Sequence, residues 1–146
     1  MATSNEQSVD ALNELLRGEI SAVETYRQAM VKLNESGNRV QIQDCHLSHE
    51  QRVAKLRDQV RRAGGTPSEG SGAWGAFAKL IEGGAKVFGE GAAVAALEEG
   101  EDHGLKLYRD NLPKLDLAAR QLVESELLPA QEQTHRAMST LKKTMS

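Results

Sequence analysis

The segment GEISAVETYR at residues 18–27 is matched by GEDHGLKLYR at residues 100–109, and the fold prediction starts from this pair. Both segments begin with Gly-Glu and end with Tyr-Arg, so that Glu101 follows Glu19 at an offset of 82 residues. A repeat of this length predicts one structural unit that occurs twice. Each glutamate falls inside a stripe of apolar residues at helical spacing, which predicts two amphipathic helices with a buried carboxylate. The apolar residues nearest to the two glutamates on these stripes are Leu16, Val23, Leu97 and Leu105.

Periodic apolar residues predict four long helices. Gly37 lies in the short turn after the first helix, and Gly64-Gly65 ends the second. The segment 64–91 then reads as a long, partly helical crossover, and Pro129 predicts a kink inside the fourth helix. Short, long and short connections predict an all-α fold, an antiparallel four-helix bundle that forms a single domain over residues 1–146. The four helices are expected at about residues 8–34, 40–63, 92–111 and 115–142.

The composition supports this fold class and excludes several partners. With 39% hydrophobic and only 3% aromatic residues, the chain suits a helical core of Leu, Ala and Val. The net charge of -3 and the pI of about 5.8 provide no basic surface for nucleic acid, so none is expected as a partner. The sequence shows neither a secretory signal nor a membrane-spanning run. Cys45 is the single cysteine, which fits a reducing compartment, and we expect a cytoplasmic protein.

Titratable residues also interrupt the apolar stripes of the second and fourth helices. His46 and His49 step in register with the apolar residues around them, and Glu132 and His135 project from one face because they are three residues apart. With a four-residue insertion, the two pairs align at an offset of 86 residues. Buried carboxylates need partners, and carboxylates with imidazoles are the ligands of transition metals. The predicted metal ligands are Glu19, His46, His49, Glu101, Glu132 and His135.

This arrangement resembles the ferritin-like superfamily of di-iron carboxylate proteins. In that superfamily the site takes one Glu from each of two helices and a Glu-x-x-His pair from each of the other two. Glu19 and Glu101 match the lone glutamates, and each precedes a Tyr by seven residues, as in bacterioferritin-type first helices. The likeness runs from LNELL at residues 12–16 through GGTP at residues 64–67 to the last helix. Over that length the chain is similar to a bacterial ferritin-like family of undetermined function.

The resemblance implies an iron cofactor and oxidation of Fe(II) by oxygen or peroxide. In such a site Glu132 would bridge two irons, and His46 stands where the family has a second bridging glutamate. Mixed carboxylate and imidazole donors also leave zinc, another divalent transition metal or a single ion open. The terminal ligands implied by the resemblance are Glu19, Glu101, His49 and His135.

A second hypothesis needs no metal. The same titratable residues would then form a hydrogen-bonded polar layer in a helical interaction or stress protein. His46 separates the two hypotheses, because a polar layer accommodates it more easily than a di-iron enzyme does. The amphipathic crossover with Trp74 and Phe77 leaves open whether it covers the bundle or forms a homodimer surface.

Overall fold

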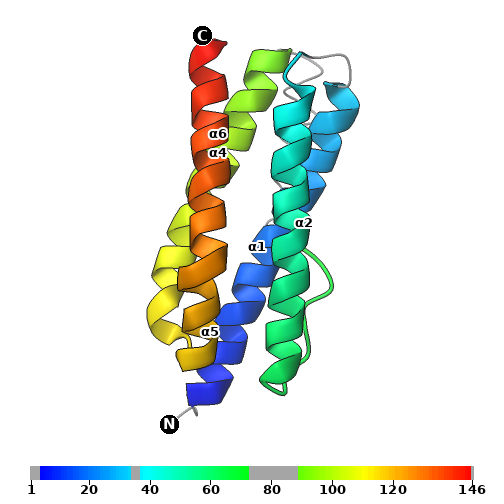
Figure 1. Cartoon of the computed structure of the whole chain (residues 1–146). Helices are drawn as coiled ribbons and strands as arrows, with labels where there is room; N and C mark the ends of the chain where they lie inside the picture. Colours follow the sequence, from blue (N-terminus) through cyan, green and yellow to red (C-terminus); the bar gives the residue numbers. More distant parts are fainter. Residues whose placement is uncertain (1–3, 34–36, 73–88, 146) are drawn as a thin grey trace.

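A computed structural model describes residues 4–33, 37–72 and 89–145 of the chain. Within these ranges every regular element is helical, so the predicted all-α class is confirmed (Figure 1). The predicted bounds of the first three helices differ from the observed ones by at most four residues. The long helices are α1 (Ser4–Lys32), α2 (Arg39–Arg62), α4 (Glu90–Asn111) and the final segment, which comprises α5 (Leu117–Leu122), a π-helical turn (Val123–Leu127) and α6 (Leu128–Thr144).

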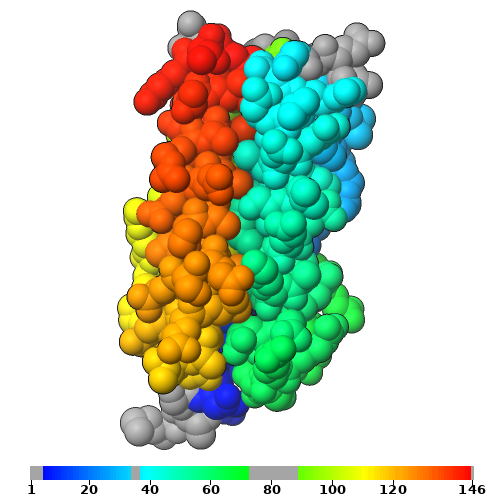
Figure 2. Space-filling view, viewed as in Figure 1, coloured from blue at the N-terminus to red at the C-terminus, as the bar shows by residue number. Residues whose placement is uncertain are grey.

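The helices pack along one another over most of their length. In Figure 1, α1 rises from the N-terminus, α2 and α4 both descend, and α6 rises to the C-terminus. α1 lies beside α2, and α4 lies beside α6 (Figure 1). Figure 2 shows α2 and α6 next to each other along one face of the molecule. No helix among the described residues is both long and apolar enough to cross a membrane.

Among the described residues, the buried apolar side chains form two clusters rather than one continuous core. One cluster contains Leu12 of α1 and Leu56 of α2, and the other contains Ala29 of α1 and Ile42 of α2. On α2, α4 and α6, buried polar residues lie between the residues that pack in one cluster and those that pack in the other. They are His49, Arg52, Glu101, Gln131 and Thr134. The polar residues therefore form a layer across the middle of the bundle.

The final helical segment departs from α-geometry just before Pro129. A proline inside a helix lacks a backbone N–H and clashes with the carbonyl four residues earlier, here that of Ser125. The π turn at Val123–Leu127 contains that carbonyl and widens the helix there. The sequence predicts a kink at Pro129; the structure shows a π turn just before the proline, after which α6 continues to Thr144.

The first part of the predicted crossover lies against α1. Gly64 has a φ of 82°, a left-handed conformation that suits glycine, and there the chain leaves α2. Asn13 accepts a hydrogen bond from the Ser68 backbone N–H at 2.8 Å, and Arg17 donates to the Ser68 hydroxyl at 2.9 Å. The remainder of the crossover, with Trp74 and Phe77, lies outside the described residues.

Candidate functional site

A layer of eight polar side chains crosses the middle of the bundle. Each of the four long helical segments contributes two of them, and none is more than 4% exposed. Burial of so many polar groups is costly unless they satisfy one another, so their contacts decide what the layer can do. We call this set the polar layer: Glu19 and Tyr26 of α1, His49 and Arg52 of α2, Glu101 and Tyr108 of α4, and Gln131 and Thr134 of α6.

His49 lies between the two glutamates of the layer. Its Nδ1 is 2.5 Å from Glu19 Oε1, and its Nε2 is 2.7 Å from Glu101 Oε2. When both carboxylates are ionised, both ring nitrogens must donate, so the ring is an imidazolium. Burial by itself would lower the pKa of His49, but the charges of Glu101 and Glu19 raise it above the ordinary value of 6.5.

Arg52 lies one helical turn after His49 and is also buried, with 1% of the residue exposed. Its Nη1 donates to Glu19 Oε2 at 3.1 Å and to the side-chain oxygen of Gln131. Its Nη2 donates to Thr134 Oγ1 at 3.0 Å and to Ser48 Oγ at 3.2 Å. The guanidinium thus has partners on α1, α2 and α6, and its charge faces the Glu19 carboxylate.

The two tyrosines connect the halves of the repeat crosswise. Tyr26 of the first half donates to Glu101 Oε2 of the second at 2.5 Å, and Tyr108 of the second half donates to Glu19 Oε2 of the first. Tyr26 also stacks on the His49 ring, with ring centroids 5.2 Å apart. Burial and the neighbouring carboxylates raise the pKa of both phenols well above 10, so the phenols keep the protons that they donate.

The charges of the layer balance. Burial by itself would raise the pKa of Glu19, but Arg52, His49 and the hydrogen bonds lower it to about 2. Burial by itself would also raise the pKa of Glu101. The nearby His49, and to a smaller extent Arg52, lower that pKa below its ordinary value of 4.5. With Glu19 and Glu101 ionised and His49 protonated, two carboxylates face one guanidinium and one imidazolium, and the charges of the layer sum to zero.

The internal repeat holds through the whole layer at one offset. Glu101, Tyr108, Gln131 and Thr134 each follow their counterparts Glu19, Tyr26, His49 and Arg52 by 82 residues. The four-residue insertion expected from the sequence is therefore wrong for the buried positions. The pairs expected from the sequence are His46-x-x-His49 and Glu132-x-x-His135. The pairs that contact the two glutamates are His49-x-x-Arg52 and Gln131-x-x-Thr134.

The structure brings together three of the six predicted ligands, namely Glu19, His49 and Glu101. His46 lies outside the layer, where its Nδ1 is 3.0 Å from Glu50 Oε1, and burial lowers its pKa. The buried Nε2 of His46 has no hydrogen-bond partner among the described residues. That these residues bind a metal stays a prediction.

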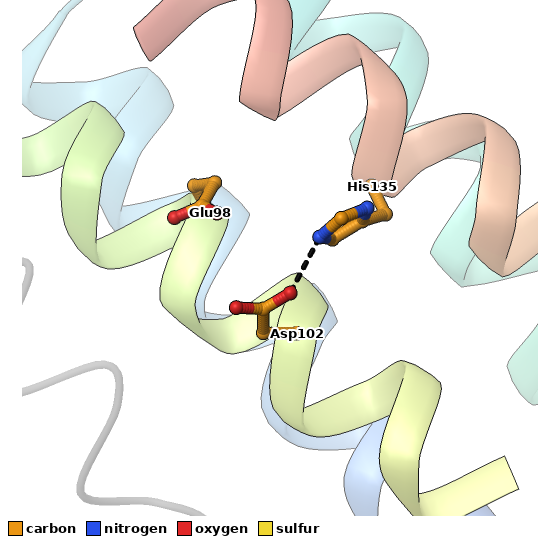
Figure 3. Close-up of side chains that lie close together, drawn as sticks. All are labelled: Glu98, Asp102 and His135. Atoms are coloured by element: carbon orange, nitrogen blue, oxygen red, sulfur yellow. Dashed lines mark hydrogen bonds and ion pairs between the residues drawn. The ribbon is translucent and has the colours of Figure 1, made fainter. Parts of the chain in front are cut away.

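Glu132 and His135 likewise do not reach the two core glutamates. Glu132 is half-buried on α6, one residue along from Gln131. His135 Nε2 lies 2.5 Å from Asp102 Oδ1 of α4, on the outer side of the α4–α6 contact (Figure 3). One donor atom each of Glu98, Asp102 and His135 lie within 4.8 Å of one another. We call these three residues the outer cluster.

Sequence reasoning misses five of the eight layer residues as functional candidates. Gln131 and Thr134 were missed because the adjacent residues have the more obvious ligand chemistry. Arg52 shares the face of His49 at a spacing of three residues, and this spacing was the available signal for it. Tyr108, like Tyr26, stands out in the sequence only as a residue of the repeat.

A small cavity adjoins the layer between α1 and α4. It has a volume of about 40 Å³, and small residues such as Gly18, Ala22 and Gly104 form part of its wall. Glu19 and Glu101 also line it. One water molecule needs at least about 10–15 Å³ of such a volume, so the cavity has room for only a few waters.

Comparison with known proteins places the chain in a family. A search of curated proteins and a search of solved structures each found no match. A family model described as "Domain of unknown function" (DUF2383) matches residues 7–114, which include six of the eight layer residues. Since the match covers more than half of the chain, this protein belongs to the DUF2383 family, a domain family of unknown function.

Proposed function

We propose that this protein is a metal-independent relative of the ferritin-like di-iron bundles, in which Arg52 and protonated His49 take the place of the metal charge. Its buried layer is then a permanent structural element. The protein acts through its outer surface, as an interaction protein, and not through oxidation chemistry in its core. The observation that carries this proposal is the position of the Arg52 guanidinium, buried against Glu19.

The course of the helices supports the ferritin-like part of the proposal. An order of up, down, down and up, with its long connection in the middle, is that of an antiparallel bundle with one crossover. Lone glutamates on the first and third long helices and i, i+3 pairs on the second and fourth have the layout of a di-iron site. In this chain the two pairs are His49-x-x-Arg52 and Gln131-x-x-Thr134 instead of Glu-x-x-His.

The donor set at the centre of the bundle does not fit a di-iron group. A metal ligand needs a free lone pair, and both nitrogens of His49 point at carboxylate oxygens within 2.7 Å. A metal ion there would also meet the positive charge of Arg52, which is 3.1 Å from the same carboxylate. Gln131 and Thr134 provide neutral oxygens at the positions where ferritin-like di-iron proteins have a carboxylate and an imidazole. We derive no reaction step through iron.

The size of the cavity favours a function outside the core. About 40 Å³ beside Glu19 and Glu101 leaves no room for an organic substrate, whose pockets are usually several hundred Å³. The charged groups of the layer are all engaged with one another, so none is free to act as a nucleophile. The surface of the bundle is then the part that can meet a partner.

Iron oxidation tests the proposal. Wild-type protein and the Glu19→Gln variant are loaded with Fe(II) without oxygen and then mixed with oxygenated buffer, and ferric absorbance is followed. Glu19→Gln preserves the side-chain shape and removes one of the two carboxylates at the centre of the bundle. We expect the same slow oxidation from both proteins. A rapid, stoichiometric phase in the wild type that the variant lacks would overturn the proposal in favour of a ferroxidase.

A further inference from the structure

We propose that the outer cluster, Glu98 and Asp102 of α4 with His135 of α6, binds one divalent transition-metal ion of the Zn²⁺ class. This site is separate from the polar layer and does not depend on the proposed function. It lies on the outside of the bundle, where α4 and α6 meet (Figure 3).

The three donors converge from two helices. Glu98 and Asp102 are four residues apart and so project from the same face of α4. His135 reaches them from α6, and one donor atom of each residue lies within 4.8 Å of the other two. In a tetrahedral zinc site with ligand distances of about 2.0–2.2 Å, ligand atoms are roughly 3.3–3.5 Å apart. Small side-chain rotations therefore bring all three donors into range of a common ion.

The chemistry of the donors selects the class of ion. One imidazole nitrogen with two carboxylate oxygens is a mixed set that suits zinc and its neighbours better than calcium or magnesium, which take oxygen ligands. Three protein ligands leave a fourth tetrahedral position for water. The side chains of Asp102 and His135 are 61% and 23% exposed, so water and ions can reach the site.

The charges at the outer cluster favour a cation. Two carboxylates lie close together, and their mutual repulsion is relieved by a positive charge between them. Lys142 approaches Glu98 at 3.3 Å, but its side chain is 51% exposed and such a surface pair is easily exchanged. Independently of the structure, the spacing of Glu132-x-x-His135 identifies His135 as a candidate ligand.

Calorimetric titration with Zn²⁺, together with melting temperatures, tests the site. We expect one Zn²⁺ per chain in the wild type and a higher melting temperature in its presence, because an ion that binds the native state stabilises it. The Asp102→Asn/His135→Ala variant should lose both effects. These residues lie outside the layer, so the variant should still fold, which circular dichroism without metal checks.

Two matched variants make the result specific. His46→Ala removes a histidine that pairs with Glu50 away from the outer cluster, and Glu19→Gln alters the core. Circular dichroism first establishes that both variants are folded, and the folded proteins should bind Zn²⁺ like the wild type. Equal Zn²⁺ uptake by the wild type and Asp102→Asn/His135→Ala would overturn the proposed site. Loss of Zn²⁺ in Glu19→Gln alone would instead place the metal in the core and contradict the proposed function.

Discussion

Arg52 is the side chain on which the polar layer depends most. It is almost completely buried and donates hydrogen bonds to Glu19, Gln131 and Thr134, which lie on two other helices. Without it, the Glu19 carboxylate would lose a charged partner in a region that water cannot reach. Removal of one member of a buried ion pair usually costs far more than the pair itself contributes, because the other charge is left uncompensated.

We therefore expect Arg52→Met to lower the free energy of unfolding by about 3–5 kcal/mol, as measured by urea denaturation. Arg62→Met is the matched control on the same helix. Arg62 pairs with Asp58 at 2.6 Å, but both side chains are more than half exposed, so this change should stay within about 0.5 kcal/mol. Equal effects of the two substitutions would mean that Arg52 is not a partner of the core carboxylates.

His49 makes stability depend on pH in a defined direction. Its pKa is raised above 6.5 in the folded protein, so its contribution is complete below pH 6.5 and is lost as the pH rises through the raised pKa. Glu19 acts oppositely, since its pKa falls from 4.5 to about 2. Its contribution is complete above pH 4.5 and is lost as the pH falls toward 2. The layer should stabilise the fold most between these limits.

Unfolding free energies at a series of pH values check this dependence. From pH 6.5 upward the wild type should lose stability, and a His49→Gln variant should be less stable but lack that loss. His46→Gln is the control, because the pKa of His46 is lowered and its ring carries no such stabilising charge. An alkaline loss that persists in His49→Gln would show that another group causes it.

Three members of the layer could be predicted from sequence, and one decisive member could not. Glu19 and Glu101 stand out because carboxylates interrupt apolar stripes, and His49 falls on such a stripe as well. The spacing from His49 places Arg52 on the same helix face, but arginine is usually a surface residue, and its contacts with α1 and α6 show that it is buried. A charge balance between residues 33 positions apart (19 to 52) is a property of packing, and local spacing does not reveal it.

At the scale of elements, the π turn keeps the inward face of the fourth helix directed at the core. Steps of four residues advance about 40° beyond a full turn of an α-helix, and several in succession would rotate off the core. The widened turn at Val123–Leu127 absorbs this drift, so that the inward stripe continues through Gln131 and Thr134. Glu132 and His135 are then turned away from the centre. The inward residues of this segment are Leu115, Ala119, Val123, Leu127, Gln131, Thr134, Met138 and Leu141.

The close approach of α4 and α6 depends on Gly104. A Cβ at this position would lie 2.5 Å from Gln131 Nε2, and that nitrogen donates to the Glu101 side chain at 2.9 Å. We expect Gly104→Ala to destabilise the protein by about 1–3 kcal/mol, because Gln131 must move and leave buried polar groups unsatisfied. The melting temperature and urea denaturation measure the change.

Gly91 provides the comparison on the same helix. Among the described residues, a Cβ there meets nothing within 4 Å, so Gly91→Ala should be neutral or stabilise α4 by up to about 1 kcal/mol through helix propensity. If Gly104→Ala were as stable as Gly91→Ala, the contact between α4 and Gln131 would not hold the layer in place.

At the scale of the whole molecule, the two halves share one layout but differ in charge. Each half contributes a glutamate and a tyrosine, whereas both cations, His49 and Arg52, come from the first half. The number and extent of the helices follow from periodicity and could be predicted. The difference in charge lies at His49 and Arg52, which align with the neutral Gln131 and Thr134 at an offset of 82 residues. The sequence does not show this difference until the structure establishes that offset.

The same layout allows a gain-of-function test. Replacement of both i, i+3 pairs by Glu-x-x-His would complete the di-iron donor set around Glu19 and Glu101. We expect this variant to take up two Co²⁺ per chain at the core, seen by its visible absorption, and to need metal for full stability. The wild type serves as the control and should show no such core absorption. The four substitutions are His49→Glu, Arg52→His, Gln131→Glu and Thr134→His.

Failure of a folded variant to bind Co²⁺ would argue that the bundle does not have di-iron geometry. Circular dichroism with and without Co²⁺ distinguishes that outcome from loss of the fold. The Asp102→Asn/His135→Ala changes, added to both proteins, remove any contribution of the outer cluster.

The protonation state of His49 tests the central claim most directly. Imidazole ¹⁵N and ¹H resonances are recorded at about pH 7.5, where an ordinary histidine is mostly neutral, before and after addition of Zn²⁺. We predict that His49 has protons on both nitrogens and does not respond to the metal, while His135 shifts. A neutral or metal-bound nitrogen in His49 would contradict the account, because the layer would then lack one of the two cations that replace the metal.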